Sequence, residues 1–122
     1  MKTFRILITG SRDYSDKNRI RRVFINVMKK FDNYDGYVLI SGACPTGADR
    51  IAEEVAKGLE WKIERYPAEW SKHGKNAGPK RNQEMVNSGA DICLAFPTNK
   101  SIGTWDCTRR AEKAGILTKI FK

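Results

Sequence analysis

Hydrophobic and polar residues follow two patterns along the chain, and these patterns predict strands that alternate with helices. Short apolar runs such as Ile92 to Phe96 have the length and composition of buried strands. Longer segments carry apolar residues at helical spacing, as in the series Ile20, Val23, Phe24, Val27, Met28 and Phe31. The strands are expected at residues 4–9, 37–41, 61–66, 92–96 and 116–121. The helices are expected from Ser15 or Asp16 to Phe31, and at residues 48–59, 79–88 and 104–114.

This alternation predicts an α/β fold, with one parallel sheet covered by helices on both faces. The chain has 122 residues, which suits a single domain spanning residues 1–122. The expected topology is a Rossmann-like sheet of five parallel strands in the order 3-2-1-4-5. Ligands of such sheets bind beyond the carboxyl ends of the strands, where the winding reverses. Here that point lies between the strands at 4–9 and 92–96.

Two turns at this edge have the composition of phosphate-binding loops. Gly10-Ser11-Arg12 follows the first strand, and Ser101-Ile102-Gly103-Thr104 precedes a helix. The first-turn amides of a helix and its dipole attract anions, and Gly103 would allow a ligand to approach the backbone. The alternative is an ordinary turn whose helix is capped by Ser101 or Thr104.

The other connections carry further signals. Gly42-Ala43-Cys44-Pro45-Thr46-Gly47 is a second glycine-bearing turn, and the spacing of Thr46 and Asp49 indicates a variant capping box. Gly58 and Gly89 are expected to end their helices. Residues 67–79 form the longest segment expected to be irregular, a lid or a mobile tip with His73 exposed.

Composition narrows the class of partner. The formal net charge of +9 favours an anionic partner, either a phosphorylated small molecule or, weakly and without specificity, nucleic acid, although a basic surface also promotes solubility. Three separated cysteines and one histidine argue against a zinc site or a disulfide framework and favour a cytoplasmic protein, with no metal or cofactor expected. No apolar stretch is long enough to span a membrane, and no signal peptide is expected. The sequence does not decide whether the protein forms a homo-oligomer.

Four ordered motifs carry a resemblance that covers nearly the whole chain. They are Gly10-Ser11-Arg12-Asp13, Thr46-Gly47-Ala48-Asp49, Gly78-Pro79-Lys80-Arg81-Asn82 and Ser101-Ile102-Gly103-Thr104-Trp105-Asp106. The chain resembles the YspA branch of the SLOG superfamily, YpsA-related proteins common in bacteria and phages. The resemblance implies a Rossmann-like fold and a site for a nucleotide or a nucleotide-derived ligand. The superfamily also includes the "lonely guy" phosphoribohydrolases and the DNA-binding DprA proteins.

The match to the phosphoribohydrolases supports binding better than catalysis. Arg81 and Gly103-Thr104 correspond to their arginine and glycine loop, but Cys107 stands where those enzymes carry a catalytic glutamate. Asp106 is one residue away, and it is the only carboxylate near the expected site that could act as a base. The double glycine of the hydrolase loop is also absent.

Several candidate residues have competing interpretations. Arg12 either grips phosphate or pairs with Asp13 or Asp16, and Asp49 either accepts ribose hydroxyls or caps a helix. Trp70 and Trp105 either stack on a base or pack against the sheet, and Cys44, Cys93 and Cys107 are expected to be packing residues rather than nucleophiles. The residues expected to bind ligand or phosphate are Gly10, Ser11, Arg12, Gly42, Thr46, Gly47, Asp49, Arg81, Asn82, Ser101, Gly103 and Thr104.

These observations favour a small-molecule binding module for a nucleotide or nucleotide-derived ligand. Such a protein would act as a sensor, carrier or sequestering protein, with phage or bacterial defence as one setting. Two alternatives stay open, a phosphoribohydrolase-like nucleotide hydrolase and a DprA-like nucleic-acid binder. The missing glutamate disfavours the first, and the absence of a basic strand face with interleaved aromatics disfavours the second.

Overall fold

Five parallel strands form the centre of the molecule in the order β3-β2-β1-β4-β5, as the sequence predicts. The computed structural model describes residues 2–99 and 101–122. The strands are β1 Thr3–Gly10, β2 Gly36–Ser41, β3 Lys62–Arg65, β4 Ile92–Phe96 and β5 Leu117–Ile120. β1 pairs directly with β4, so the winding reverses between these two strands. The winding therefore reverses between the same two strands as the sequence predicts.

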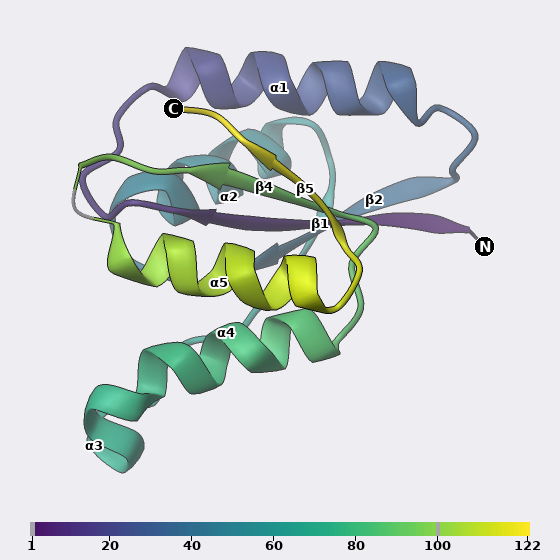
Figure 1. Ribbon diagram of the computed structural model, residues 1–122. Helices are drawn as coiled ribbons and strands as arrows, with labels where there is room; N and C mark the ends of the chain where they lie inside the picture. The colour runs from purple at the N-terminus through teal and green to yellow at the C-terminus, as the bar shows by residue number, and fades with distance from the viewer. Residues whose placement is uncertain (1, 100) are drawn as a thin grey trace.

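Helices cover both faces of the sheet (Figure 1). The helices are α1 Lys17–Lys30, α2 Gly47–Gly58, α3 Trp70–His73, the 3₁₀ helix η1 Gly74–Asn76, α4 Ala77–Asn87 and α5 Ile102–Lys113. α1 and α2 contact each other on one face, and α4 and α5 contact each other on the other. Because the strands are parallel, the helices of the crossovers begin at the carboxyl edge of the sheet, and the short α3 projects beyond α4 (Figure 1).

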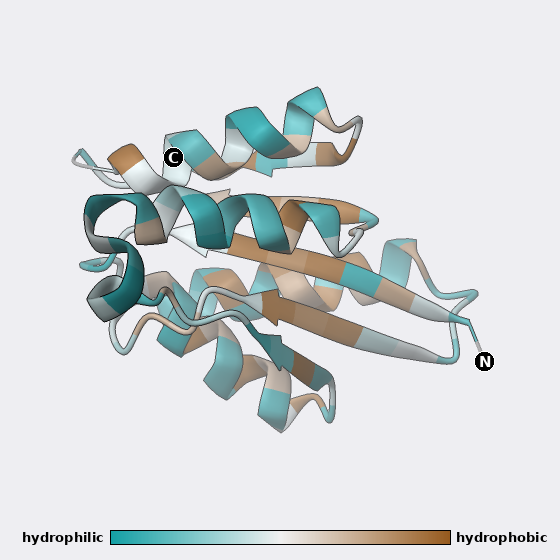
Figure 2. Ribbon diagram, turned by 90° about the horizontal axis from the view of Figure 1, so that it is seen from below, coloured by the Kyte–Doolittle hydropathy of each residue, from teal (hydrophilic) through white to brown (hydrophobic). Residues whose placement is uncertain are grey.

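The core consists of two apolar layers, one on each side of the sheet. The larger layer packs Ile20 and Phe24 of α1 and Ala52 of α2 against β1, β2 and β4. The smaller layer packs Met85 of α4 and Cys107 of α5, together with their apolar neighbours, against Leu7, Ile40 and Cys93. Figure 2 shows the central strands as apolar bands between helices whose outer faces are polar. Burial on both faces explains why β4 has an uninterrupted apolar sequence.

The segment 67–79 differs from its predicted irregular conformation. Most of it is helical, because α3 and η1 follow one another and α4 begins at Ala77, before Pro79. Ala77 and Gly78 are buried, and a Cβ on Gly78 would lie 3.3 Å from Cη2 of Trp70. A four-residue helix is too short to show an apolar period, so the sequence pattern contains no sign of it.

One helix end differs from prediction. α5 begins at Ile102 rather than Thr104, which places Gly103 within its first turn. α2 ends at Gly58, as expected, and the residue with positive φ that follows it is Glu60 at 63°. Gly89 does end α4 with a φ of 88°, as expected.

Candidate functional site

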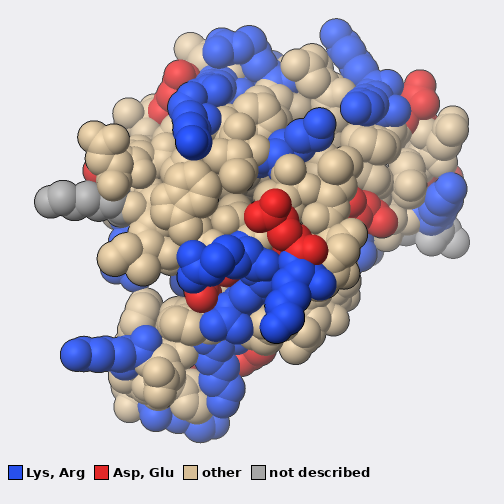
Figure 3. Space-filling view, viewed as in Figure 1, with Lys and Arg blue, Asp and Glu red and all other residues tan. Residues whose placement is uncertain are grey.

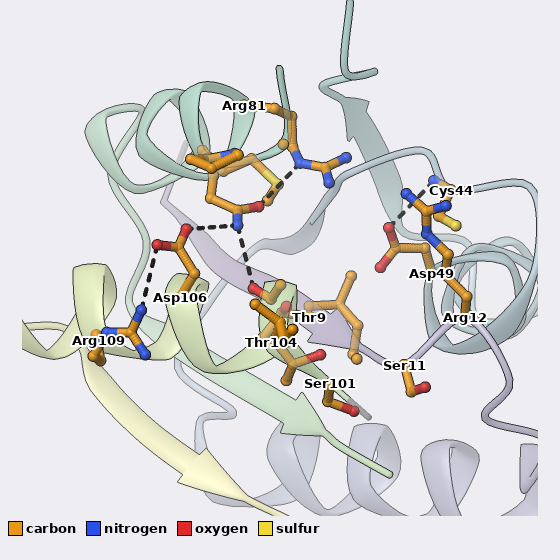
Figure 4. Close-up of a pocket in the computed structure, with 18 of the residues that line it drawn as sticks. Thr9, Ser11, Arg12, Cys44, Asp49, Arg81, Ser101, Thr104, Asp106 and Arg109 are labelled. Carbon is orange, nitrogen blue, oxygen red and sulfur yellow. Dashed lines mark hydrogen bonds and ion pairs between the residues drawn. The ribbon is translucent and has the colours of Figure 1, made fainter. Parts of the chain in front are cut away.

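A cavity of about 750 Å³ opens at the carboxyl ends of β1 and β4 (Figure 4). Segments far apart in the chain converge here, namely the β1–α1 turn, the N-terminal halves of α4 and α5, and α3. Nine of the twelve residues expected to bind ligand line this cavity. They are Gly10, Ser11, Arg12, Asp49, Arg81, Asn82, Ser101, Gly103 and Thr104.

The other three predicted residues lie outside the cavity lining. The carbonyl of Gly42 accepts a hydrogen bond from Nη1 of Arg81 at 2.6 Å. Gly47 has a φ of 72° and packs its Cα against the backbone of Ser11 and Arg12, where a side chain would collide. Thr46 is exposed and stands at the N-cap of α2 without a side-chain cap bond. Gly42 and Gly47 therefore do not line the cavity themselves but contact residues that do, namely Arg81, Ser11 and Arg12.

The turns after β1 and β4 are held together by a hydroxyl network. The hydroxyl of Thr98 lies 2.8 Å from Ser11 Oγ and 2.8 Å from Asp13 Oδ1. Asp13 also accepts from the hydroxyl of Ser11, and these two hydrogen bonds hold the pKa of Asp13 below its ordinary value. Asp13 and Thr98 were not among the predicted site residues. Their contact joins positions 85 residues apart, which no local pattern reveals.

The first turn of α5 faces the cavity without a side-chain cap. Ser101 is the N-cap residue, but its hydroxyl turns back to accept from the N–H of Thr98 at 2.8 Å and to donate to the carbonyl of Thr98 at 2.9 Å. A Cβ placed on Gly103 would meet no atom within 4 Å. The capping alternative for Ser101 is therefore not realised, and the helix presents its N-terminal donors and dipole beside open space.

A polar network on α4 and α5 fixes the opposite wall (Figure 4). Nε of Arg81 donates to the side chain of Asn82 at 3.0 Å, and Asn82 donates to Oδ2 of Asp106 at 3.0 Å. Nε of Arg110 also donates to that oxygen, at 2.9 Å, and Arg109 lies 3.6 Å from the other. Burial opposes ionisation of Asp106, but the hydrogen bonds from Arg110 and Asn82 lower its pKa. A carboxylate held in this way is a weak base.

Asp49, in the first turn of α2, is the third carboxylate of the cavity lining, and it does not form the predicted capping box. Its side chain does not bond to Thr46 but accepts from the N–H of Cys44 at 3.2 Å. The residue is 8% exposed. Burial raises the pKa of Asp49 to about 6, against the opposing effects of the Cys44 N–H and the charges of Arg81 and Arg12. The sequence indicates Asp106 as the one candidate base near the site. Asp49 is a second candidate.

Arg12 and Trp70 form the outer rim. The guanidinium of Arg12 lies 5.6 Å from the ring centroid of Trp70, a cation–π arrangement. Asp13 and Asp16 are engaged elsewhere, Asp16 as the cap of α1, so neither predicted pairing of Arg12 is present in the described residues. Trp70 is 50% exposed and lines the cavity, whereas the half-buried Trp105 does not.

Of the three cysteines and the histidine, only Cys44 lines the cavity. Cys93 and Cys107 are completely buried in the smaller core layer, as packing residues are. Cys44 is half-buried in the cavity wall, and His73, predicted to be exposed, is half-buried. Within residues 2–99 and 101–122, no three His, Cys, Asp or Glu side chains gather as metal ligands would. Among the same residues, none of the helices has the length and apolar character needed to cross a membrane.

Comparison with known proteins gives two matches. The sequence model of the family described as "YspA, cpYpsA-related SLOG family" matches residues 4–73. The chain is also 42% identical over 117 residues to "Gene 61 protein" of Mycobacterium phage D29, an alignment covering 92% of this chain and 91% of the phage protein. The family match covers β1 to α3, and the phage similarity extends over the α4 and α5 wall of the cavity.

Proposed function

Because the chain belongs to the YspA, cpYpsA-related SLOG family, we propose that it binds a phosphorylated nucleoside, or a ligand derived from one, in the cavity beside β1 and β4. The first turn of α5 is the observation that carries this proposal. It lines the cavity at the point where the sheet reverses its winding, its N-cap side chain is turned away, and Gly103 leaves room for a ligand. These features suit a phosphate group.

The charges of the cavity support an anionic ligand. Arg12, Lys75, Arg81 and Arg109 line it, and two of the three lining carboxylates, Asp13 and Asp106, are already engaged by hydroxyl or guanidinium donors. Lys and Arg side chains also gather over α3, α4 and α5 on the face shown in Figure 3. A guanidinium binds phosphate in a fork geometry, so Arg81 and Arg12 are the expected charged contacts.

The proposed activity is binding without turnover, as in a sensor, carrier or sequestering protein. Cys107 is buried away from the cavity, so it offers no group at the place of the phosphoribohydrolase glutamate. Asp106 is engaged by Asn82 and Arg110, which restricts its movement toward a sugar. These two residues support a binding role over hydrolysis.

Thermal unfolding and calorimetry with AMP, adenosine and adenine test the binding proposal. AMP is expected to raise the melting temperature, and the two unphosphorylated compounds are not. Gly103→Val should abolish the effect of AMP because the added side chain fills the space above the first turn of α5. The matched control is Gly58→Val on α2, where an added Cβ also meets open space but far from the cavity lining.

Arg81→Ala should weaken AMP binding by about 1.5–3 kcal/mol, the scale of a hydrogen bond to a charged group. Arg50→Ala is its control, since Arg50 is an exposed α2 residue whose partner is Glu54. If AMP binds the Gly103 and Arg81 variants as tightly as the parent, the ligand does not occupy this cavity. If no nucleoside monophosphate binds the parent protein, the proposal is wrong.

A further inference from the structure

One carboxylate oxygen of Asp49, in the lining of the cavity, receives no hydrogen bond from the described residues. One oxygen, Oδ2, accepts the N–H of Cys44 at 3.2 Å, and within the described residues no donor bonds to the other. The side chain is more than nine-tenths buried, and Figure 4 shows its carboxylate directed toward the cavity. Among the described residues only the hydroxyl of Tyr14 is both fully buried and without a partner, so this oxygen of Asp49 is open to the cavity, where water or a ligand can donate to it.

Arg81 faces Asp49 without pairing with it. A Cβ built on Gly42 would lie 2.6 Å from Nη1 of Arg81 and 3.0 Å from Oδ2 of Asp49, so the two side chains approach the same point from either side. No ion pair between them occurs in the part of the chain that the structure describes. Arg81 instead donates to the carbonyl of Gly42 and to Asn82. A donor and an acceptor therefore lie beside the same glycine without bonding to each other, and a small polar ligand group could contact both.

The surrounding charges restrict what that group can be. Arg81 and Arg12 both act on Asp49, and this positive field disfavours a cationic ligand group. Glu53 is the nearby negative group, but it is engaged by the hydroxyl of Ser41 at 2.7 Å and by Arg65 at 3.2 Å. The group that meets Asp49 must therefore be a neutral donor.

A hydroxyl fits better than the edge of a base. Guanine would present two parallel N–H donors to both carboxylate oxygens, but Oδ2 is already turned to the amide of Cys44. A hydroxyl needs a single acceptor oxygen and can itself accept from Arg81. In a nucleotide whose phosphate lies at α5, the ribose hydroxyls are the neutral donors nearest the phosphate.

We propose that Asp49 selects ribonucleotides over 2′-deoxyribonucleotides by accepting a hydrogen bond from the ribose 2′-hydroxyl, with Arg81 donating to the same sugar. This inference rests on the proposed nucleotide-binding function and specifies the sugar that the cavity takes. A deoxyribose would exclude water from the Asp49 carboxylate without replacing its hydrogen bond. A site built around a hydroxyl rejects an analogue that lacks it for this reason.

The test compares dissociation constants of AMP and 2′-deoxy-AMP at pH 8 for the parent protein, Asp49→Asn and Glu53→Gln. The parent is expected to prefer AMP by about 10- to 100-fold, the range of a hydrogen bond to a charged group. Asp49→Asn keeps the side-chain volume and an acceptor for Cys44, and its preference should shrink to a few-fold. Glu53→Gln removes a carboxylate of the same helix that does not line the cavity, and its preference should match the parent.

The outcomes separate this inference from the proposal on which it rests. Equal binding of AMP and 2′-deoxy-AMP by the parent would overturn the role of Asp49 while leaving nucleotide binding intact. An unchanged preference in Asp49→Asn would assign selection to another residue and would also overturn it. A strong preference for GMP over IMP that disappears in Asp49→Asn would show that the carboxylate meets a base, contrary to the inference. Failure of the parent to bind any nucleotide would refute both proposals.

Discussion

Replacing Asp49 by Asn should stabilise the protein at neutral pH, even though it removes a residue proposed to bind ligand. Asp49 is buried, and its pKa in the folded chain is raised to about 6 from a reference value of 3.8. The folded state therefore holds this proton more tightly than the unfolded state does. The free energy of unfolding contributed by Asp49 falls as the pH rises from about 4 through about 6, because the carboxylate must then ionise in a buried position.

The size of this effect follows from the shift. Each unit of pKa difference corresponds to about 1.4 kcal/mol, so ionisation of Asp49 costs about 3 kcal/mol at pH 8. About half of that cost is already present at pH 5, and little remains at pH 4. Asn does not titrate and keeps an oxygen for the N–H of Cys44. The stability of Asp49→Asn relative to the parent should therefore increase by about 2–3 kcal/mol between pH 4 and pH 8.

Urea unfolding followed by tryptophan fluorescence at several values between pH 4 and pH 8 measures this difference. The control is Asp32→Asn, which removes the same charge at an exposed position after α1. The relative stability of that variant should stay constant over this range to within about 0.5 kcal/mol, as for most surface substitutions. Parallel pH profiles for Asp49→Asn and the parent would show that Asp49 is not desolvated in the folded chain. That result would also remove the physical basis for its proposed selectivity.

Two further predictions concern chemistry and partners. AMP, GMP, CMP and UMP should release no free base, as measured by chromatography, when each is incubated with a high concentration of the protein, because Asp106 is held by Asn82 and Arg110. Release of base that is lost in Asp106→Asn or Asp49→Asn would instead identify a hydrolase. Any binding of single-stranded DNA should be independent of sequence and fall at least about tenfold between 50 and 200 mM salt, because it would depend on phosphate contacts. Tight binding that survives 200 mM salt in a filter or anisotropy assay would favour a DprA-like function.

The sheet is the part of the fold that the sequence predicts most fully. Apolar runs bounded by glycine or proline define strands because burial on both faces demands them, and the strand order follows from right-handed crossovers between parallel strands. The family resemblance, read from four motifs, is also confirmed. The same reasoning predicts where the cavity lies, since the edge beside β1 and β4 is set by topology alone.

Side-chain partners are the part that only the tertiary structure decides. Thr46 and Asp49 have the spacing of a capping box, but the β2–α2 turn presents the N–H of Cys44 to Asp49 instead. Trp70 meets Arg12, and Asn82 meets Asp106, across 58 and 24 residues of chain. Local spacing records which residues share a helix face or a turn, and it contains no information on contacts made by packing one element against another. The sequence by itself determined the sheet and the edge at which the cavity lies; the packing of α2, α4 and α5 against that sheet decided which polar groups face the cavity and which of them are buried or paired.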